Sequence, residues 1–396
     1  MSPVLVVLTL SLLLGIQPVT TDLYLPALPS LVEGFGAPVS QAQLTLTTLL
    51  LAFGISQLAW GPLSDRFGRR PILIYGMAAY TLASVVCALA PTMPLLIAAR
   101  TVQGAAMGAA VMCARAIVRD LYSPAAGARA MSRALSGLGV IACLAVPVGA
   151  VLAELLGWRQ ALTALAIFGA AVLVLVTTRF KETIPLKNPA ALQPRTLALT
   201  WLAIVRHPTF VAYSVLSTAS YAGLFTFLAS SSFVFIRVLG LSRIEYGLAM
   251  FWMSAVYIAG TFMCRRMLPR FGVRRSVALA AVLTFTGGSL LGGLALAGVH
   301  NVWAIMLPFC LFMLAHGVHQ PCGQSGAVGP FPLAAGAASA LNGFLMMVAA
   351  FIVGGWIGTR LDGSVFALTN GVWFWSVCIS LAAWTLVQRY GEPRSA

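Results

Sequence analysis

Apolar residues occur along this chain in long continuous runs that are separated by short polar segments. Most runs are about 20 residues long, which is the length of a helix that crosses a bilayer, and they lack the apolar–polar alternation of membrane strands. The pattern therefore predicts an all-α integral membrane protein with about twelve transmembrane helices. We expect these helices near residues 3–30, 42–62, 71–90, 94–117, 133–155, 158–178, 208–232, 245–266, 275–298, 302–322, 336–357 and 364–388.

Composition supports a membrane protein over a soluble one. Hydrophobic residues make up 60% of the 396 residues and charged residues only 8%, with a mean hydropathy of +0.94. A soluble domain carries about 25% charged residues, so this chain has too few to solvate the surface of soluble domains. The first apolar run extends from Pro3 to Thr21 with no basic segment before it. We interpret it as the first span rather than a signal peptide.

The basic residues predict the orientation of the chain. There are 24 Lys and Arg against 9 Asp and Glu, which gives a formal charge of +15. They form short clusters between spans, so binding to nucleic acid is not expected. With both termini inside, cytoplasmic segments hold 19 of these residues and outer segments hold 4. By the positive-inside rule, both termini are predicted to be cytoplasmic.

Two halves are indicated by a polar, proline-containing connection in the middle of the chain. We expect a six-helix bundle over 1–178, a cytoplasmic linker over 179–207 and a second six-helix bundle over 208–396. An internal repeat supports this division, because RFGRR at residues 66–70 is matched by RFGVRR at residues 270–275, 204 residues further on. A chain of two six-span repeats is an architecture of secondary transporters.

Signatures of other functions are not found in the sequence. It contains no ATP-binding G-x-x-x-x-G-K-[ST], no H-E-x-x-H and no G-x-S-x-G motif, which argues against an ATP-driven pump or an enzyme. The seven cysteines form no C-x-x-C pair and lie mostly in apolar runs, so we expect small packing residues rather than a disulfide framework or a zinc site. No cofactor or metal is predicted.

The most specific motif follows the second span, where residues 61–71 read GPLSDRFGRRP. Gly61 is expected to allow close helix packing, and Gly68 a tight turn. Asp65 is placed to face a helix N-terminus, and the arginines to anchor the turn at anionic headgroups. A generic positively charged loop is the alternative interpretation. The motif resembles the loop 2–3 signature of the major facilitator superfamily.

That resemblance implies a conformational latch on the cytoplasmic side. In the family, the Asp and the Arg four positions later pair with an acid at the cytoplasmic end of span four, and here these residues are Asp65, Arg69 and Asp120. The repeat has Pro269 in place of the Asp, so the second half is not expected to form the same latch. The predicted latch residues are Gly61, Asp65, Arg66, Gly68, Arg69, Arg70 and Asp120.

Span four contains Arg100 in the sequence RTVQGAAMG, which resembles the superfamily's R-x-x-Q-G motif. An arginine inside a span costs about 2.5–3.5 kcal/mol on insertion scales, so we expect it to face a cavity or a partner. Snorkelling to the outer interface is the alternative. Gly104 and Gly108 predict a close helix contact.

Asp22 is the one acid that the sequence places clearly inside a span. It lies in QPVTTDLYLPALP, which resembles the first-span signature of the bicyclomycin/chloramphenicol-resistance (Bcr/CflA) branch of drug:proton antiporters. Apolar neighbours disfavour a charged carboxylate, so Asp22 is a candidate for taking up and releasing protons, with Arg100 at the same site. A position at the outer surface is the alternative.

Residues 335–344, AGAASALNGF, also resemble this branch, whereas HGVHQPC at residues 316–322 departs from it, because Cys322 stands where an Asn is usual. His316 and His319 lack a third ligand nearby, so a polar cavity lining or packing role is favoured over a metal site. Span five keeps Pro147 but lacks the Gly-Pro and Gly-Gly pairs of antiporters, which slightly weakens the case for antiport. The predicted substrate-cavity residues are Tyr24, Gln103, Met107, Tyr221, Phe225, Trp252, Tyr257, His316 and Asn342.

The resemblance implies proton-coupled efflux of small amphiphilic drug-like compounds, of chloramphenicol or bicyclomycin type, by alternating access. The alternative is an exporter or importer of a small metabolite, because the fold does not fix the substrate. The expected partners are a small-molecule substrate, protons and the lipid bilayer. We expect a functional monomer in the bacterial inner membrane.

Overall fold

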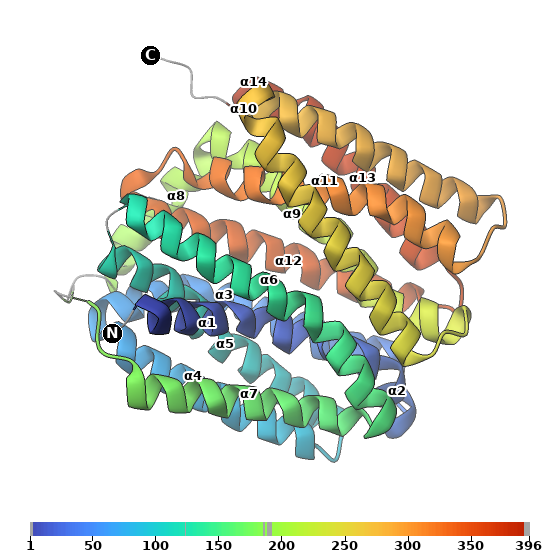
Figure 1. The fold of residues 1–396 in the computed structure, drawn as a ribbon, viewed down its shortest axis with the longest axis horizontal. Coiled ribbons are helices and arrows are strands. Elements are labelled where there is room, and N and C mark those ends of the chain that lie inside the picture. Colours follow the sequence, from blue (N-terminus) through green and yellow to red (C-terminus); the bar gives the residue numbers. More distant parts are fainter. Residues whose placement is uncertain (1–2, 123, 185–186, 188–191, 392–396) are drawn as a thin grey trace. The chain divides into compact units, whose positions relative to one another are not determined.

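The computed structural model describes residues 3–122, 124–184, 187 and 192–391. Over these residues the chain consists of helices and short connections, with no strand assigned (Figure 1). The predicted all-helical membrane fold is confirmed. The chain divides into two compact units, residues 1–197 and 198–396, and each is described separately below.

The first unit contains the helices α1 to α7 and one short 3-10 turn. They are α1 (Pro3–Asp22), the 3-10 turn η1 (Leu25–Ala27), α2 (Leu28–Phe35), α3 (Val39–Phe67), α4 (Arg69–Leu89), α5 (Met93–Leu121), α6 (Pro124–Leu155) and α7 (Trp158–Arg179). α1, η1 and α2 together form the first candidate span, Val4–Phe35. Pro26 and Pro29 lie at this break, where a proline lacks the amide hydrogen that a continuous helix needs.

The second unit follows a short helix, α8 (Pro194–Arg206), in which the division between the units falls. Its elements are α9 (Pro208–Ser232), the π-helical turn η3 (Phe233–Val238), α10 (Arg243–Leu296), α11 (Val302–Val328), the 3-10 turn η4 (Pro332–Ala334), α12 (Ala335–Arg360), α13 (Phe366–Trp384) and α14 (Leu386–Tyr390). α8 lies within the predicted linker 179–207, of which residues 185–186 and 188–191 are outside the described residues. The predicted domain boundaries therefore stay a prediction.

Eleven of the described helical segments are long and apolar enough to span a membrane. One of them, α10, has 54 residues and is interrupted at Gly272, where φ is 70°. Fifty-four helical residues extend about 80 Å, well over the roughly 30 Å of a hydrocarbon core, so α10 supplies two spans. The segments then agree with the twelve spans predicted from the sequence.

Small residues allow helices to pack closely within the first unit. α1 lies beside α6, and α4 beside α7 (Figure 1). On α5, a Cβ at Gly104 would lie 2.0 Å from the Leu49 carbonyl oxygen of α3, and one at Gly108 would lie 2.1 Å from Ser56 Oγ. The predicted close contact of span four is confirmed.

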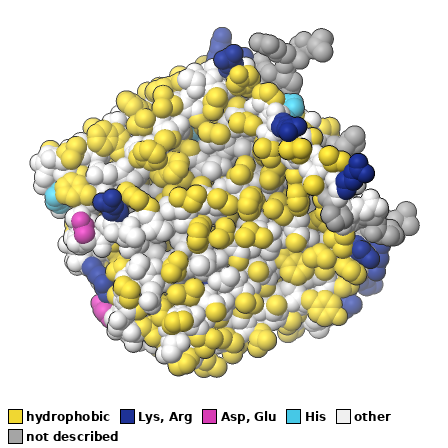
Figure 2. Space-filling model, turned by 180° about the vertical axis from the view of Figure 1, so that it is seen from behind, with side chains coloured by type: hydrophobic (Ala, Val, Ile, Leu, Met, Phe, Trp, Pro, Cys, Tyr) yellow, Lys and Arg dark blue, Asp and Glu magenta, His cyan; other side chains and the backbone are white. Residues whose placement is uncertain are grey.

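Figure 2 shows one face of the molecule, on which hydrophobic side chains predominate and charged side chains are few. Large apolar residues such as Leu82, Ile167, Leu248 and Phe374 are more than half exposed. A surface of this kind is stable only in contact with lipid, which agrees with a multi-pass membrane protein.

Candidate functional site

Asp22 lies inside the first candidate span. It is the last residue of α1, 18 residues after Val4 and 13 before Phe35, the two ends of the span. The other acids of the described spans lie within two residues of a span end. Asp22 is partly exposed, and its Oδ1 accepts a hydrogen bond of 2.7 Å from Thr21 Oγ1. Asp22 is the last of 20 helical residues, which extend about 30 Å, so its depth in the membrane stays a prediction.

A glycine of α6 allows the backbone at the α1 break to pack closely. A Cβ at Gly149 would lie 1.9 Å from the carbonyl oxygen of Leu23, the residue after Asp22. Any larger residue at this position must displace backbone rather than a flexible side chain. Span five thus retains close packing beside Asp22, although it lacks the paired glycines of the antiporter motif.

Arg100 is fully buried in the first unit, which excludes the snorkelling alternative. Its guanidinium donates to the carbonyl oxygens of Thr45 at 3.3 Å and Thr20 at 3.0 Å, and to Gln103 Oε1 at 2.7 Å. The face of the Tyr24 ring lies 4.4 Å from its Cζ. Three helices, α1, α3 and α5, are therefore joined through one cation, whose charge is offset by carbonyl dipoles and an aromatic face.

Arg100 was predicted to lie at the same site as Asp22, and it contacts the backbone near Asp22 rather than its carboxylate. Among the described residues no ion pair joins the two side chains, and Arg100 instead holds the Thr20 carbonyl, two residues before Asp22. Thr20 Oγ1 also lies 2.7 Å from Tyr80 Oη on α4. The last turn of α1 is thus fixed on one side, while the carboxylate of Asp22 has Thr21 as its side-chain partner.

Tyr24, Gln103 and Met107, which were predicted to line a substrate cavity, are fully buried. Tyr24 Oη lies 2.8 Å from Thr45 Oγ1, and Gln103 Nε2 donates to Ser84 Oγ at 2.6 Å. Their polar atoms therefore serve the network around Arg100. A role in binding substrate stays a prediction for these three residues.

The predicted latch residues Asp65, Arg69 and Asp120 form a cluster where the ends of α3 and α5 meet the start of α4. Arg69 contacts Asp65 Oδ1 at 2.6 Å through Nη2 and Asp120 Oδ2 at 2.8 Å through Nε. Its Nη1 donates to Ser64 Oγ at 2.6 Å. Arg69 is only 1% exposed and Asp120 only 7%, so two opposite charges are largely removed from water together. Arg119 also lies 3.4 Å from Asp65.

Glu182, which follows α7, completes this cluster and was missed by the sequence analysis. Its carboxylate accepts the backbone N–H groups of Arg69 at 2.9 Å and Arg70 at 3.1 Å, at the N-terminus of α4. Burial alone would raise the pKa of Glu182, but backbone N–H groups of Arg69, Ile184, Arg70 and Thr183 lower it below its ordinary value. An acid soon after the end of a span was the available signal, because helix N-termini attract carboxylates.

Gly68 is required at the turn, whereas Gly61 is not required for packing. Gly68 has φ of +110°, and a Cβ there would lie 2.5 Å from Glu182 Oε2. A Cβ at Gly61 would lie 3.6 Å from Met112 Cε, an ordinary contact with a flexible side chain. This contact does not require a glycine at position 61, and the expectation that Gly61 serves close packing stays a prediction. Arg66 also lies apart from the cluster, with its Cζ 5.5 Å from the ring of Phe67.

The second copy of the motif repeats the turn and one arginine contact. Gly272 has a positive φ, as Gly68 does. Arg70 donates to the carbonyl oxygens of Thr177 and Phe180 at the end of α7, and Arg274 donates to that of Gln388 in α14. In each unit, this arginine therefore ties the turn to the C-terminal end of the last span. Pro269 replaces the acid, so the ion-pair cluster belongs to the first unit.

A buried polar cluster occupies the middle of the second unit. His316 Nδ1 lies 2.8 Å from Ser220 Oγ, and Ser217, one turn away on α9, donates to Asn342 Oδ1 at 3.0 Å. The rings of Tyr257 and His316 are 5.5 Å apart. Two of the predicted cavity residues, His316 and Asn342, are thus brought to one face of α9, although both are buried.

The remaining predicted cavity residues of the second unit are placed differently. The rings of Tyr221 and Phe225 stack on α9 at 6.4 Å. Trp252 is 58% exposed, unlike Phe225, which is 3% exposed. His319 Nε2 lies 3.3 Å from the Val277 carbonyl oxygen, away from Ser220, and no group of three or more metal-ligating residues occurs in the described part of the chain. The two histidines therefore serve different contacts, and the metal interpretation gains no support.

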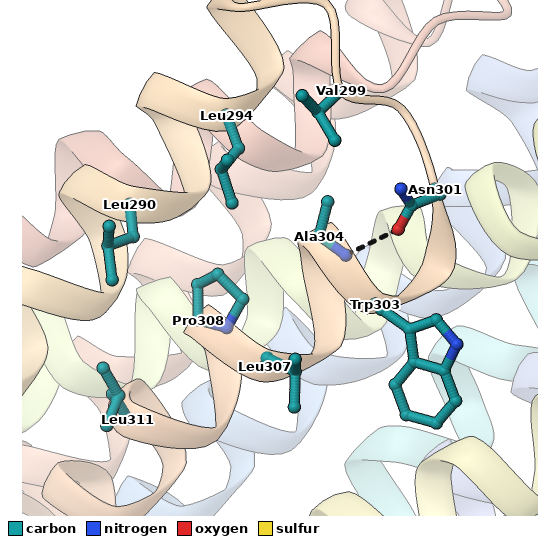
Figure 3. Close-up of a pocket in the computed structure, with 9 residues that line it drawn as sticks. All are labelled: Leu290, Leu294, Val299, Asn301, Trp303, Ala304, Leu307, Pro308 and Leu311. Atoms are coloured by element: carbon teal, nitrogen blue, oxygen red, sulfur yellow. Dashed lines mark hydrogen bonds between the residues drawn. The ribbon is translucent and has the colours of Figure 1, made fainter.

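An apolar groove of about 550 Å³ lies at the N-terminal end of α11 (Figure 3). Its lining is Leu290, Leu294, Val299, Asn301, Trp303, Ala304, Leu307, Pro308 and Leu311. The Asn301 side chain accepts the Ala304 backbone N–H at 2.9 Å, so it caps the helix. Trp303 and Leu307 are 68% and 61% exposed. This groove is distinct from the polar cluster and offers a surface suited to lipid chains.

Together, a multi-span helical fold with a repeated turn, a carboxylate within a candidate span and an ion-pair cluster at the turn between α3 and α4 are typical of a membrane transporter. The family model described as "Major Facilitator Superfamily" matches residues 10–354. This chain belongs to that family. It is therefore a transporter rather than an enzyme.

Similar proteins come from several bacteria. Multidrug resistance protein D of Escherichia coli (strain K12) is 30% identical over 342 residues, covering 86% of this chain and 85% of that protein. Multidrug resistance protein MdtL of Escherichia coli O9:H4 (strain HS) is 29% identical over 371 residues, with 89% and 91% covered. YdgK of Bacillus subtilis (strain 168), an uncharacterized MFS-type transporter, is 28% identical over 362 residues, with 89% of each chain covered.

Solved transporter structures share the fold. The partially occluded, inward-open form of the xylose transporter XylE from E. coli matches with a TM-score of 0.75 at 16% identity, covering 100% of this chain and 99% of that one. The human organic anion transporter MFSD10 matches with a TM-score of 0.67 at 19% identity, covering 98% and 100%. At these identities the likeness concerns the fold alone.

Proposed function

We propose that this transporter exports small amphiphilic drug-like compounds, of chloramphenicol or bicyclomycin type, in exchange for protons. The observation that carries the proposal is the position of Asp22, a carboxylate at the broken centre of the first span. Support for drugs as the substrate class comes from the names of two relatives, Multidrug resistance protein D and Multidrug resistance protein MdtL.

Proton coupling in this proposal depends on the contrast between Asp22 and Arg100. Each of the three guanidinium nitrogens of Arg100 donates one hydrogen bond, to two carbonyl oxygens and to Gln103, and the bond to Thr20 fixes the last turn of α1. Asp22 is a titratable group with one side-chain partner. Protonation neutralises Asp22, and a bound cationic or dipolar substrate replaces the proton. Proton and substrate thus compete for one region, and each is released on the opposite side of the membrane.

Alternating access in the proposal uses the cluster of Asp65, Arg69 and Asp120 as a latch. The cluster closes the cytoplasmic side in the outward-facing state and opens in the inward-facing state. Substrate contacts are assigned to the predicted cavity residues of both units, among them Tyr257, His316 and Asn342. We further propose a monomer in the bacterial inner membrane, with both termini in the cytoplasm and no nucleic-acid partner.

The test is transport by Asp22→Asn, because this variant removes the titratable group with little change of shape. In inside-out vesicles with an imposed pH gradient, wild-type protein is expected to accumulate chloramphenicol or bicyclomycin, and Asp22→Asn to lose this proton-driven uptake. Expression of wild type in a strain that lacks its own efflux pumps should raise resistance.

A matched control is Glu33→Gln, which makes the same acid-to-amide change two residues from the end of the same span. It should retain proton-driven transport. Wild-type activity of Asp22→Asn would reject the coupling role of Asp22. Failure of wild type to move any compound of an amphiphilic drug panel would favour a metabolite as substrate.

A further inference from the structure

Two cysteine thiols meet inside the second unit, and neither is among the residues assigned to transport. Cys264 of α10 and Cys322 of α11 are 3% and 2% exposed, and their Sγ atoms lie 3.9 Å apart. Both are free thiols. The sequence predicted small packing residues here, because its cysteines form no C-x-x-C pair and lie mostly in apolar runs. Cys264 and Cys322 are 58 positions apart along the chain.

The distance between these thiols is fixed by a close crossing of the two helices. A Cβ at Gly260 would lie 2.4 Å from the Leu314 carbonyl oxygen, and one at Gly317 would lie 2.6 Å from the carbonyl carbon of Gly260. Backbone therefore touches backbone one helical turn before Cys264. Such a contact leaves little freedom to change the separation of side chains nearby.

The sulfur–sulfur distance distinguishes between the ligands that two thiols can share. A disulfide requires about 2.0 Å, so these atoms would have to approach by nearly 2 Å. A linear ion with sulfur bonds of about 2.3 Å requires about 4.6 Å, whereas a bent centre with angles of about 100–110° requires about 3.5–3.8 Å. The observed 3.9 Å is closest to the bent arrangement.

The bent arrangement also limits the kind of centre that fits. A tetrahedral metal such as zinc needs further protein ligands, and the described residues contain no group of three or more His, Cys, Asp or Glu able to hold one. A trivalent organoarsenical brings its own organic substituent and needs only two sulfurs. We propose that Cys264 and Cys322 form a dithiol binding site for small trivalent organoarsenicals.

The reaction requires no oxidant. For an arsenical R–As(OH)₂, two As–O bonds break and two As–S bonds form. The thiol protons leave with the two hydroxides as two molecules of water, and arsenic remains trivalent. The reagent, the thiols and the product are neutral, so no charge is created inside the membrane. A small R group is favoured, because both sulfur atoms are buried, and the product links α10 to α11.

The test uses purified full-length protein and methylarsonous acid, whose R group is methyl. Intact-mass measurement of wild type should show one methylarsenic adduct per chain, and the number of thiols reactive after denaturation should fall from seven to five. Peptide mapping should recover the adduct on peptides of α10 joined to α11. A dithiol such as 2,3-dimercaptopropanol should release it, whereas the same thiol concentration of a monothiol should not.

Variants separate this site from the other cysteines. Cys264→Ser and Cys322→Ser should each lose the monothiol-resistant adduct, and Cys264→Ala and Cys322→Ala provide a second pair in case a hydroxyl disturbs folding. Cys310→Ser, on the same helix as Cys322, is the matched control and should keep one adduct. An unmodified wild type, a native Cys264–Cys322 disulfide, or an adduct that survives in Cys264→Ser/Cys322→Ser would overturn the proposal. Because bound arsenic is counted directly, the result is independent of drug export.

Discussion

At the scale of single residues, Arg100 and Asp22 of the first unit differ in the number of partners that their polar atoms contact. Arg100 is fully buried, with two carbonyl oxygens, Gln103 and the ring of Tyr24 around its guanidinium. Asp22 is partly exposed and has Thr21 as its side-chain partner. In the function proposed above, Arg100 fixes the last turn of α1 through the Thr20 carbonyl, and Asp22 exchanges its proton for substrate.

Glu182 provides a prediction of pH dependence. Its folded-state pKa lies below the ordinary value of 4.5, because the effect of four backbone N–H groups exceeds that of burial. A depressed pKa stabilises the fold above the unfolded pKa, and this contribution is lost as the pH falls through the folded value. Glu182 should therefore remain charged at pH 5–8 and lose its contribution only below about pH 4.5.

Glu182→Gln should lower the free energy of unfolding by about 0.5–1 kcal/mol at pH 7, a small value because Glu182 is exposed to solvent. Thermal unfolding in detergent measures this difference. The difference between variant and wild type should be constant from pH 6 to 8. A difference that grows as the pH rises through neutrality would contradict the assignment.

At the scale of elements, the crossing of α1 and α6 leads to a prediction about Gly149. Gly149→Ala would place a Cβ 1.9 Å from the Leu23 carbonyl oxygen, so α1 must shift beside Asp22. The expected cost is about 1–3 kcal/mol, as for other overpacked sites. Thermal unfolding and the yield of monodisperse protein measure the effect.

Gly139→Ala is the matched control on the same helix, because no atom lies within 4 Å of the position of its Cβ. This change should be neutral or stabilise α6 by about 0.5–1 kcal/mol, since a helical glycine loses more conformational freedom than alanine. Equal destabilisation by both substitutions would show that the close approach at Leu23 is not the cause.

The spans and part of the site were predictable from the sequence because they depend on local signals. Apolar run length located the twelve spans, and the family resemblance of residues 61–71 implied the contacts of Arg69 with Asp65 and Asp120. Contacts between segments that are distant along the chain could not be predicted in this way. The bond from Arg69 N to Glu182 crosses 113 residues, and no local pattern gives its register. To predict the burial of Arg100, one would need the positions of α1, α3 and α5 relative to one another. These positions are set only when the chain folds.

At the scale of the whole molecule, the latch cluster predicts a change in conformational populations. Asp65→Asn removes the 2.6 Å ion pair with Arg69 and leaves Asp120 in place. The outward-facing state should lose about 1–3 kcal/mol, which shifts its equilibrium with inward-facing states about five- to 150-fold. Cysteine labelling from the cytoplasmic side, in a background without the native cysteines, should increase.

Arg66→Gln is a matched control for this change, since it alters a charge next to Asp65 but outside the ion-pair cluster. Labelling of Arg66→Gln should equal that of wild type. If Asp65→Asn leaves the labelling rate unchanged, the cluster stabilises the turn without controlling access to the transport site.

Coupling is also a property of the whole molecule, and it follows from the number of titratable carboxylates deep in the spans. In the described residues Asp22 alone has this position, so we expect one proton to enter in each cycle. Export of a neutral compound then moves one net charge, and export of a monovalent cation moves none. Neutral drugs should respond to both membrane potential and pH gradient, whereas monovalent cations should respond to the pH gradient alone.

Divalent cations should be poor substrates, because one carboxylate does not balance two charges in a medium of low dielectric constant. Proteoliposomes whose potential is clamped with potassium and valinomycin separate these cases. The flux of a neutral drug should change with the clamped potential at constant pH gradient, and that of a monovalent cation should not. Two protons per neutral molecule would require a second titratable site. His316 and His319 are then the first residues to replace, because both are buried in the second unit and histidine titrates nearest to neutral pH.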